Sequence, residues 1–562
     1  MIPFLFVTGI LSIFNMTQKF TYLNVVNITE SSIPIKVSAK ICSGLFNRNN
    51  SMYGEVYTIE NSVDEFWLNE LNNNEIDTIE DIRFIDNCLN SKLVTGYLKY
   101  NFLEQKLILP QLITIAGVKN IIPIDTNYFD YNIIKNIKLD FDATDILKNA
   151  SLYDSTLYIY NNYINNTTGL AKMDPGLDIH NHPFNPPLIG DINTGLIDFI
   201  VKKKLFNFFL NYGCIAGTKE HKLMEKIVNN NNWEKPIGVY GYDDTWQLGG
   251  NLFEAETNCV KEHNMGQIAT SGVTNLAYFS NKNRITVPLK QNPDPNITYS
   301  PRNKYIALVV GDGDNINMIK DDRRKWMIER VSECILNQTS KKCYPLLWTL
   351  SPQLLKTAPD IIKWYYNMSY KTGADYFILP PSGDLYSYPA QMNEDVQNMF
   401  INNTENDCKL MSTNTIIEWE WFGNWEKAFK TYYPKYKKNN VVKGFLTVNV
   451  PFMIPIYAFK DNEYYKMVSD IIIFKEREWR GTGNASTPLS KKMYLTVDEM
   501  AEEINSYPSN TITYIYLTSD GGGNLQMLNN LVKILDDNIY IVNQNQLTNF
   551  AKLSSQVNKD KR

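Results

Sequence analysis

Short runs of β-branched and aromatic residues recur along the second half of the chain, and stretches with helical spacing separate most of them. Runs such as Tyr305–Val310 are apolar throughout instead of alternating with polar residues. A strand that is apolar on both faces is typical of a parallel sheet with helical crossovers, so the pattern predicts an α/β fold. The predicted strands are Ile237–Tyr242, Val273–Phe279, Tyr305–Val310, Tyr344–Leu350, Asp375–Leu379, Thr415–Trp421, Val442–Val448, Asp470–Phe474, Thr511–Leu517 and Asn538–Val542.

The number of repeating units indicates the architecture of this domain. About eight strand–helix units in roughly 300 residues match a (β/α)8-like barrel, regular or irregular. A doubly wound open sheet is the alternative, and either topology places the working site at the carboxyl ends of the strands. We expect the barrel-like domain at 236–550, after a smaller N-terminal α/β region with a helical connector at 20–235 and before a polar tail at 551–562.

The first residues form a separate apolar segment. Pro3–Phe14 carries no charge, and its length suits the hydrophobic part of a signal peptide better than a membrane span. A positively charged start is missing, so a buried first strand or an uncleaved anchor is the alternative. We expect 1–19 to be a signal peptide, and the mature chain to be a secreted or lysosome-like vesicular glycoprotein with no membrane span.

The charge and cysteine content narrow the possible partners and cofactors. Lys and Arg number 55 and Asp and Glu 60, with no long basic tract, so nucleic acid is not expected as a partner. The cysteines form no CxxC pair and the four histidines complete no zinc spacing, so we expect no metal and no other cofactor. Disulfides are plausible between neighbouring cysteines, with reduced structural thiols as the alternative. The pairings are Cys42–Cys88, Cys214–Cys259 and Cys334–Cys343, which leave Cys408 unpaired.

Acids and aromatic residues stand at or just after the ends of several predicted strands. Glycoside cleavage needs two carboxylates, one as acid and one as base or nucleophile. Sugar rings pack on indole and phenol rings, which offer flat apolar area with a polar edge. The pattern therefore predicts a carbohydrate site at the strand ends. Its residues are Asp244 and Trp246, then Asp312, Asp314 and Asn315, then Trp348, then Asp384, Tyr386 and Tyr388, and finally Glu420 and Trp425.

Four segments carry a resemblance to a known family. GVYGYDDTW, VVGDGDN, LLWTLSP and PPSGDLYSYP occur in this order and resemble the GxGYxYP putative glycoside hydrolases over Asp191–Val542. The N-terminal region is similar to that family's N-terminal domain. The resemblance implies an α/β fold and glycosidase chemistry. In the signature loop, Asp384 and Leu385 stand where the family has a small residue and a glycine, which leaves open whether the site still cleaves its ligand.

Two groups of acids have more than one interpretation. Asp312 and Asp314 could be catalytic or bind substrate hydroxyls, they could hold Ca²⁺ or Mg²⁺, or Asp312 could cap the following helix. Glu418 and Glu420 share one face of a strand, and Glu420 lies nearer the active end. The alternative for Glu420 is a salt bridge with a nearby lysine.

These observations lead to three functional hypotheses. The first is hydrolysis of O-glycosidic bonds in an oligosaccharide or polysaccharide by a pair of carboxylates from Asp314, Glu420, Asp244 and Asp384. In this hypothesis Asp312, Asn315, Trp246, Trp348, Tyr386, Tyr388 and Trp425 bind the substrate. The second is a catalytically inactive carbohydrate-binding glycoprotein of a surface or wall. The third is a metal-dependent hydrolase that uses the loop at 312–315.

Overall fold

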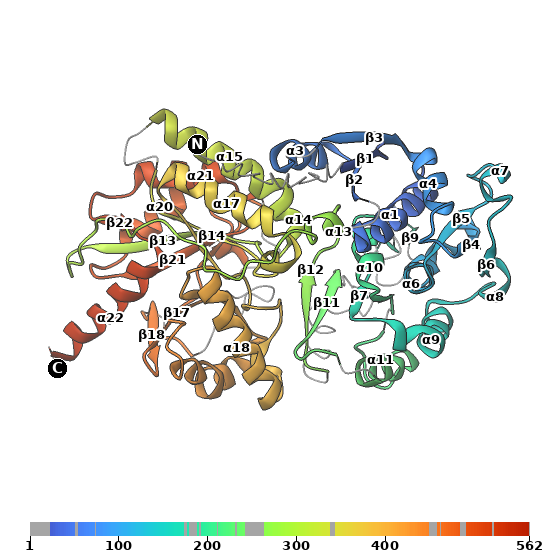
Figure 1. The fold of residues 1–562 in the computed structure, drawn as a ribbon. Coiled ribbons are helices and arrows are strands. Elements are labelled where there is room, and N and C mark those ends of the chain that lie inside the picture. The colour runs from blue at the N-terminus through green and yellow to red at the C-terminus, as the bar shows by residue number, and fades with distance from the viewer. Residues whose placement is uncertain are drawn as a thin grey trace, which may run out of the picture.

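The computed structural model describes 23–50, 54–72, 75–173, 177–178, 188–189, 193–210, 212–230, 233–241, 263–337, 343–448, 458–460, 462–483, 490–519 and 522–560. These residues form an α/β protein with several separate, mostly parallel sheets, which confirms the α/β part of the predicted fold class. Figure 1 shows two halves: the N-terminal half is blue to green and the C-terminal half is yellow to red. The expected signal peptide, Asp244, Trp246 and Cys259 lie outside the described residues.

The N-terminal half contains three parallel sheets and one short antiparallel pair. The sheet orders are β2-β1-β3, β5-β4-β6 and β10-β7-β11-β12, and β8 pairs with β9. The strands are β1 (Leu23–Asn27), β2 (Glu55–Ile59), β3 (Ile76–Glu80), β4 (Gly96–Tyr100), β5 (Ile121–Asp125), β6 (Leu139–Asp142), β7 (Leu170–Lys172), β8 (Leu177–Asp178), β9 (Leu188–Ile189), β10 (Phe206–Phe208), β11 (Ile237–Gly241) and β12 (Met265–Ala269).

Helices connect these strands, and side-chain caps fix where several of them begin. Asn61, for example, accepts hydrogen bonds from the backbone amides of Val63 and Asp64 at the start of α3. The helices are α1 (Ile33–Arg48), α3 (Ser62–Leu71), α4 (Asp81–Leu89), α5 (Phe102–Gln105), η1 (Lys106–Ile108), α6 (Leu109–Lys119), α7 (Tyr131–Ile134), α8 (Ala143–Ile146), α9 (Leu152–Tyr163), η2 (Ile164–Asn166), α10 (Ile197–Lys203), α11 (Lys219–Asn230) and α13 (Leu276–Phe279).

Two predicted strands differ from the structure. The run Ile237–Tyr242, expected as the first strand of the barrel, forms β11 and pairs with β7 and β12 in the third N-terminal sheet. The run Val273–Phe279 is not a strand, because Leu276–Phe279 forms the short helix α13. Periodicity cannot distinguish a strand from a buried helix in a short apolar run, which is why this prediction was wrong.

The C-terminal half contains two further sheets. Their orders are β15-β14-β13-β21-β20, with β22 also paired to β13, and β16-β17-β19-β18. All of the pairings are parallel except that of β18 with β19. The strands are β13 (Lys304–Val310), β14 (Leu346–Thr349), β15 (Asp375–Ile378), β16 (Thr415–Trp419), β17 (Gly444–Val448), β18 (Tyr465–Val468), β19 (Ile471–Phe474), β20 (Glu478–Trp479), β21 (Ile512–Leu517) and β22 (Ile539–Ile541).

Closure of these two sheets into a barrel is not observed. An isolated bridge between Leu379 and Ile416 links the end of β15 to β16. At the other side, no strand pairing joins β19 to β20 within the described residues. The structure therefore shows an α/β domain with two mostly parallel sheets.

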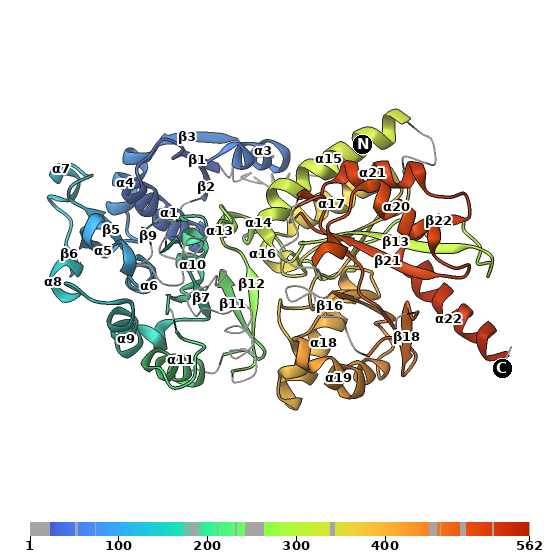
Figure 2. The same ribbon diagram turned by 180° about the vertical axis from the view of Figure 1, so that it is seen from behind.

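The long helices of the C-terminal half lie outside these sheets. In both views α15, α17, α20 and α21 lie along one side of β13 and β21, and α18 lies on the side of the other sheet (Figures 1 and 2). The helices are α14 (Ile316–Met318), η4 (Ile319–Arg323), α15 (Arg324–Asn337), α16 (Leu354–Thr357), α17 (Pro359–Thr372), η5 (Pro389–Gln391), α18 (Glu394–Leu410), η6 (Phe422–Asn424), α19 (Trp425–Lys427), η7 (Ala428–Tyr432), η8 (Tyr433–Lys437), η9 (Ser490–Met493), α20 (Val497–Ser506), α21 (Leu525–Ile534) and α22 (Gln544–Asp560).

The predicted polar tail is the end of a helix, because α22 continues to Asp560. Leu547, Phe550, Ala551 and Ser554 are buried at helical spacing, so this helix packs one face against the protein. None of the helices in the described residues has the length and apolar character that crossing a bilayer requires.

Two of the predicted disulfides are confirmed. Cys42–Cys88 joins α1 to α4, and Cys334–Cys343 joins α15 to the segment before β14. Cys408 is free and buried, as expected. The third pairing involves Cys259, which lies outside the described residues.

Aromatic side chains join the two halves near the carboxyl end of β13. Trp67 of α3 is fully buried, and its Nε1 donates to the carbonyl of Lys320 at 2.9 Å. The ring centroids of Trp67 and Trp364 are 5.2 Å apart, and Trp364 Nε1 donates to Glu70 Oε1 at 3.0 Å. The N-terminal half is therefore packed against the segment that follows β13.

Candidate functional site

The loop after β13 presents two carboxylates, and two glycines determine its path. A Cβ on Gly311 would lie 2.5 Å from the Cζ atom of the Tyr516 ring, and a Cβ on Gly313 would overlap the Thr349 carbonyl. The Gly313 amide also donates to Thr349 Oγ1 at 2.9 Å. Only glycine allows this close approach to β14 and β21, so the loop holds the intervening acid in a fixed position.

Asp312 is committed to a structural ion pair. Its Oδ2 accepts from Arg323 Nη2 at 2.8 Å, from the Ser519 amide at 3.0 Å and from Ser519 Oγ at 3.1 Å. The carboxylate thus links the β13 loop to η4 and to the loop after β21. It does not cap the next helix. Asn315 does so, because its Oδ1 accepts from two backbone amides of α14.

Asp314 is in a different environment from Asp312. Among the described residues, it forms no hydrogen bond or ion pair with another side chain. Burial and the nearby Asp312 carboxylate raise the pKa of Asp314 to about 7, and Arg323 offsets this rise only in part. A carboxyl group with this pKa holds a proton near neutral pH, which suits a general acid.

A third acid approaches the same loop from β20. The hydroxyl of Tyr516 accepts from the Asp312 amide at 3.1 Å, and Glu478 is the strand partner of Tyr516. Burial raises the pKa of Tyr516, and the carboxylates of Asp312, Asp314 and Glu478 add to the rise. Arg480 Nε lies 3.6 Å from Glu478 Oε2. Our sequence-based list omitted Glu478, although its position at a strand end is the signal that could have identified it.

The acids of β16 form a second group. Glu418 and Glu420 are 0% and 3% exposed. One oxygen of Glu420 accepts from the Ala390 amide, whereas its other oxygen and both oxygens of Glu418 have no hydrogen-bond partner in the described part of the chain. Burial raises the pKa of both carboxyl groups well above the usual range. No ion pair of Glu420 with a lysine is found among the described residues, so the salt-bridge alternative is not supported.

Most of the expected stacking platforms are buried. Trp348 is 1% exposed, and its Nε1 donates to Asp375 Oδ1 at 2.8 Å, so its ring is part of the core and offers no face to a sugar. Tyr388 and Trp425 are also buried. Tyr386 is partly exposed and packs edge-on against Trp419, with ring centroids 4.9 Å apart. Burial of these large rings stabilises the domain, so packing in the core is sufficient to explain their positions near strand ends.

Asp384 lies in a separate cavity of about 360 Å³ between the third N-terminal sheet and the C-terminal half. Its carboxylate accepts from Gln353 Nε2 at 2.8 Å and Asn403 Nδ2 at 3.0 Å. Burial raises the pKa of Asp384, and burial together with Asp384 raises that of Asp407. Asp314 is absent from the described residues that line this cavity.

The candidate residues therefore fall into three groups. Asp312, Asp314 and Asn315 share the β13 loop. Glu420, Tyr386 and Tyr388 surround the end of β16, and Asp384 lies in its own cavity. No group of three or more potential metal-ligating His, Cys, Asp or Glu side chains occurs in the described ranges.

Comparison with known proteins gives a family match for most of the C-terminal half. Residues 302–552 match the model of the GxGYxYP putative glycoside hydrolase C-terminal domain. This region of the chain belongs to that family. The family assignment covers β13 to α22, so the loop that carries Asp314 lies near the start of the family domain. No protein with a curated description matches the chain.

Solved structures give a match over almost the whole chain. A putative hydrolase from Bacteroides thetaiotaomicron superposes with a TM-score of 0.72 at 17% identity, covering 95% of each chain. At this identity the match shows the fold alone. A 4-alpha-glucanotransferase from Thermococcus litoralis (TM-score 0.29, 12% identity, 44% of this chain and 40% of that one) is too distant to support an argument. The same holds for a putative polysaccharide deacetylase from Mycobacterium smegmatis (0.30, 10%, 47% and 96%).

Proposed function

We propose that the protein hydrolyses O-glycosidic bonds at the carboxyl end of β13, with Asp314 as the general acid. The observation that carries this proposal is the contrast between two neighbouring carboxyl groups. Asp312 is paired with Arg323, whereas burial raises the pKa of Asp314 to about 7. The environments of the two groups therefore favour a proton on Asp314 and a charge on Asp312, and a carboxyl group that keeps its proton near neutral pH suits the role of general acid. The family of residues 302–552 supports a carbohydrate substrate.

The leaving group of a glycoside needs a proton as the C–O bond breaks, and a second carboxylate must activate water or attack the sugar. Asp314 supplies the proton in this proposal. Glu478 is our candidate for the second carboxylate, because it and Asp314 both lie near Tyr516 and Arg480 approaches Glu478. Glu420 is less suited to act as a base, since burial raises the pKa of its carboxyl group well above the usual range and so disfavours the ionised form that a base needs.

Two broader features belong to the same proposal. We propose that β13–β17 and β19–β21 work as an incompletely closed barrel, so that the ends of these strands share one mouth. We also propose that the chain is secreted, which the two disulfides support because disulfides persist in oxidising compartments.

A carbohydrate-binding protein without turnover is the second candidate. This second candidate is favoured by Asp384 and Leu385, where the signature loop departs from the family pattern. Asp384 is held by Gln353 and Asn403 in a separate cavity, so its carboxylate is already engaged in hydrogen bonds. A metal-dependent hydrolase at 312–315 has less support, since the Asp312 carboxylate already binds Arg323 and Ser519.

A panel of aryl and oligosaccharide glycosides tests the proposal. Wild-type protein is expected to turn over at least one substrate, and Asp314→Asn to lower kcat by about 100-fold or more, as expected for loss of a general acid. Asp395→Asn, an exposed aspartate near the start of α18, is the matched control. Binding without turnover by the wild type would support the second candidate, and full activity of Asp314→Asn would exclude Asp314 as the acid.

A further inference from the structure

A second cavity, of about 340 Å³, lies where the two halves meet. Its described lining comes from the start of α3, the segment before α10, the segment before α13, and α14 with η4. Val63 is the one apolar side chain among these lining residues, and no aromatic side chain is present. The cavity is therefore built to contact polar groups rather than an apolar ligand.

Paired charges form the floor of this cavity. Lys40 is fully buried and lies 2.5 Å from Glu60 Oε2. Burial would raise the pKa of Glu60, but Lys40 outweighs that effect and the pKa is lowered. Lys320 is also buried, and its Nζ lies 3.5 Å from Asp64 Oδ1. Each lining charge on the floor has an opposite partner, so a charged ligand would lack a counter-charge and a neutral ligand fits better.

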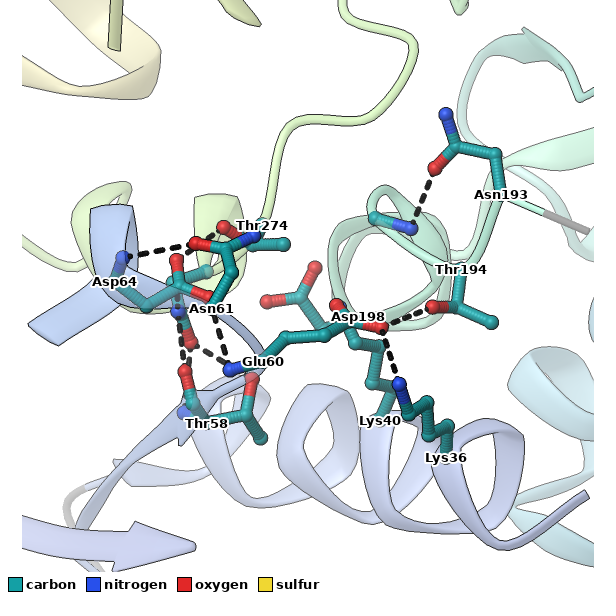
Figure 3. Close-up of polar contacts among 12 residues, drawn as sticks. Lys36, Lys40, Thr58, Glu60, Asn61, Asp64, Asn193, Thr194, Asp198 and Thr274 are labelled. Carbon is teal, nitrogen blue, oxygen red and sulfur yellow. Dashed lines mark hydrogen bonds and ion pairs between the residues drawn. The ribbon is translucent and has the colours of Figure 1, made fainter. Parts of the chain in front are cut away.

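The hydroxyl groups on the floor are held by the same acids. Thr194 Oγ1 donates to Glu60, and Thr274 Oγ1 donates to Asp64. Figure 3 shows these side chains converging from separate elements: Lys40 rises from α1, Asp64 comes from α3, and Thr194 comes from the segment before α10. The floor is consequently rigid, which lowers the entropic cost of binding.

Three asparagine side chains from distant parts of the sequence form the rim. Asn61, Asn193 and Asn317 all line the cavity and are exposed. Asn317 makes no side-chain hydrogen bond within the described residues, and Asn61 uses only its Oδ1, to cap α3. Asn193 accepts from the Gly195 amide at 3.0 Å and donates a long hydrogen bond of 3.4 Å to Ser271 Oγ. Gly272 separates two of these amides, since a Cβ there would lie 3.1 Å from Asn193 Nδ2 and from Asn317 Nδ2. Side-chain amides both donate and accept, so they match vicinal hydroxyl groups.

The rim is close to the proposed acid. Asn317 follows Asp314 by three residues. Three residues of chain span at most about 11 Å, so one oligosaccharide can reach both. We infer that this cavity is a subsite that binds one neutral, hydroxyl-rich sugar unit of the substrate through the amides of Asn61, Asn193 and Asn317. The inference rests on the proposed function, because it assigns the bound sugar to the substrate cleaved at Asp314.

Binding measurements in a non-cleaving background test the subsite. Asp314→Asn protein is screened on an array of neutral oligosaccharides, and the strongest oligosaccharide is titrated by calorimetry. Asn317→Ala is expected to weaken its binding about tenfold, the effect of one hydrogen bond, and Asn317→Leu to weaken it further by filling the space. Asn61→Asp keeps the cap but removes the donor, and it is expected to weaken binding to a similar extent.

Asn132 offers a matched control for Asn317. Both are exposed, both stand second in a short helix, and both donate their backbone amide to a capping side chain, at 2.9 Å to Asp130 and 3.0 Å to Asn315. Asn132→Ala and Asn132→Leu are expected to bind like the parent. In active protein, Asn317→Ala should raise KM for oligosaccharides and leave that for single-sugar aryl glycosides unchanged.

The outcomes separate this inference from the proposed function. Unchanged oligosaccharide affinity in the Asn317 and Asn61 variants overturns the subsite, even if Asp314-dependent turnover is found. Weakened binding without any wild-type turnover retains the site as a carbohydrate site and refutes hydrolysis. Absence of binding to every oligosaccharide on the array overturns the inference.

Discussion

Removing the charge of Asp312 provides a direct test of why Asp314 holds a proton. Burial is the largest cause of the raised pKa of Asp314, and the Asp312 carboxylate is the second. Asp312→Asn removes that charge but keeps an oxygen that can accept from Arg323 and Ser519. We therefore expect the pKa of Asp314 to fall from about 7 while staying above that of an exposed aspartate.

The size of the shift follows from Coulomb's law. Residues two apart in a chain are separated by at most about 7 Å. Two carboxylates at that distance interact by about 2.4 kcal/mol at an effective dielectric constant of about 20, which corresponds to between one and two pKa units. Because Asp314 must be protonated to act as the proposed acid, we expect wild-type activity to be lost as the pH rises through about 7. In Asp312→Asn this loss should occur about one to two units lower.

Two measurements check the shift. The first is kcat/KM against pH from 5 to 9 for any substrate that is turned over, and the second is a carbon-13 NMR titration of the Asp314 carboxyl, which does not require turnover. Asp395→Asn is the control and should leave both profiles unchanged. A midpoint that stays near 7, or moves upward in Asp312→Asn, would refute the role assigned to the Asp312 charge.

Three further predictions concern stability. Burial raises the pKa of Glu418, so its contribution to stability is present below about pH 4.5 and is lost as the pH rises. Glu418→Gln should therefore raise Tm relative to wild type at pH 8, and raise it less at pH 4.5. Equal changes in Tm at the two pH values would contradict this. Gly313→Ala should destabilise the chain by about 2 kcal/mol or more in urea unfolding, because its Cβ meets the Thr349 carbonyl. Loss of Cys42–Cys88, with a separation of 46 residues, should cost about 4 kcal/mol, and loss of Cys334–Cys343, with a separation of 9, about 3 kcal/mol. Denaturant unfolding of the two double-Ala variants checks that order.

The fold class was predictable because burial on both faces leaves a strong local signal. The six apolar residues Tyr305–Val310 follow Lys304 in β13, and all seven residues of this strand are buried. The sheet to which a strand belongs leaves no such signal, since pairing depends on contacts between distant residues. The sequence therefore located the strand Ile237–Gly241 but not its neighbours β7 and β12.

The site was predictable only in part, because residues at strand ends can either face a binding site or pack in the core. Asp314 and Asp312 are separated by one residue. Asp312 nevertheless bonds Arg323 and Ser519, whereas Asp314 makes no side-chain hydrogen bond to any other residue that the structure describes. Arg323 and Ser519 lie in two other segments of the chain, so the sequence cannot show which of the two acids they bind. The aromatic residues illustrate the same limit, since Trp348 uses its polar edge on Asp375 and its faces on the core.

The same reasoning explains why the further site was absent from the sequence-based predictions. Catalytic acids follow buried strands and can be found by scanning strand ends, whereas the rim of the second cavity is made of asparagines from a helix cap, a connector and a short helix. An asparagine is common in this chain and carries no pattern of its own. Asn317 differs from other asparagines in its position beside Gly272 and in its side-chain amide, which makes no hydrogen bond within the described residues. Both features depend on the packing of the two halves against each other. If the two halves meet in order to build a substrate site, then changes at their junction should alter oligosaccharide binding more than they alter the chemistry at Asp314.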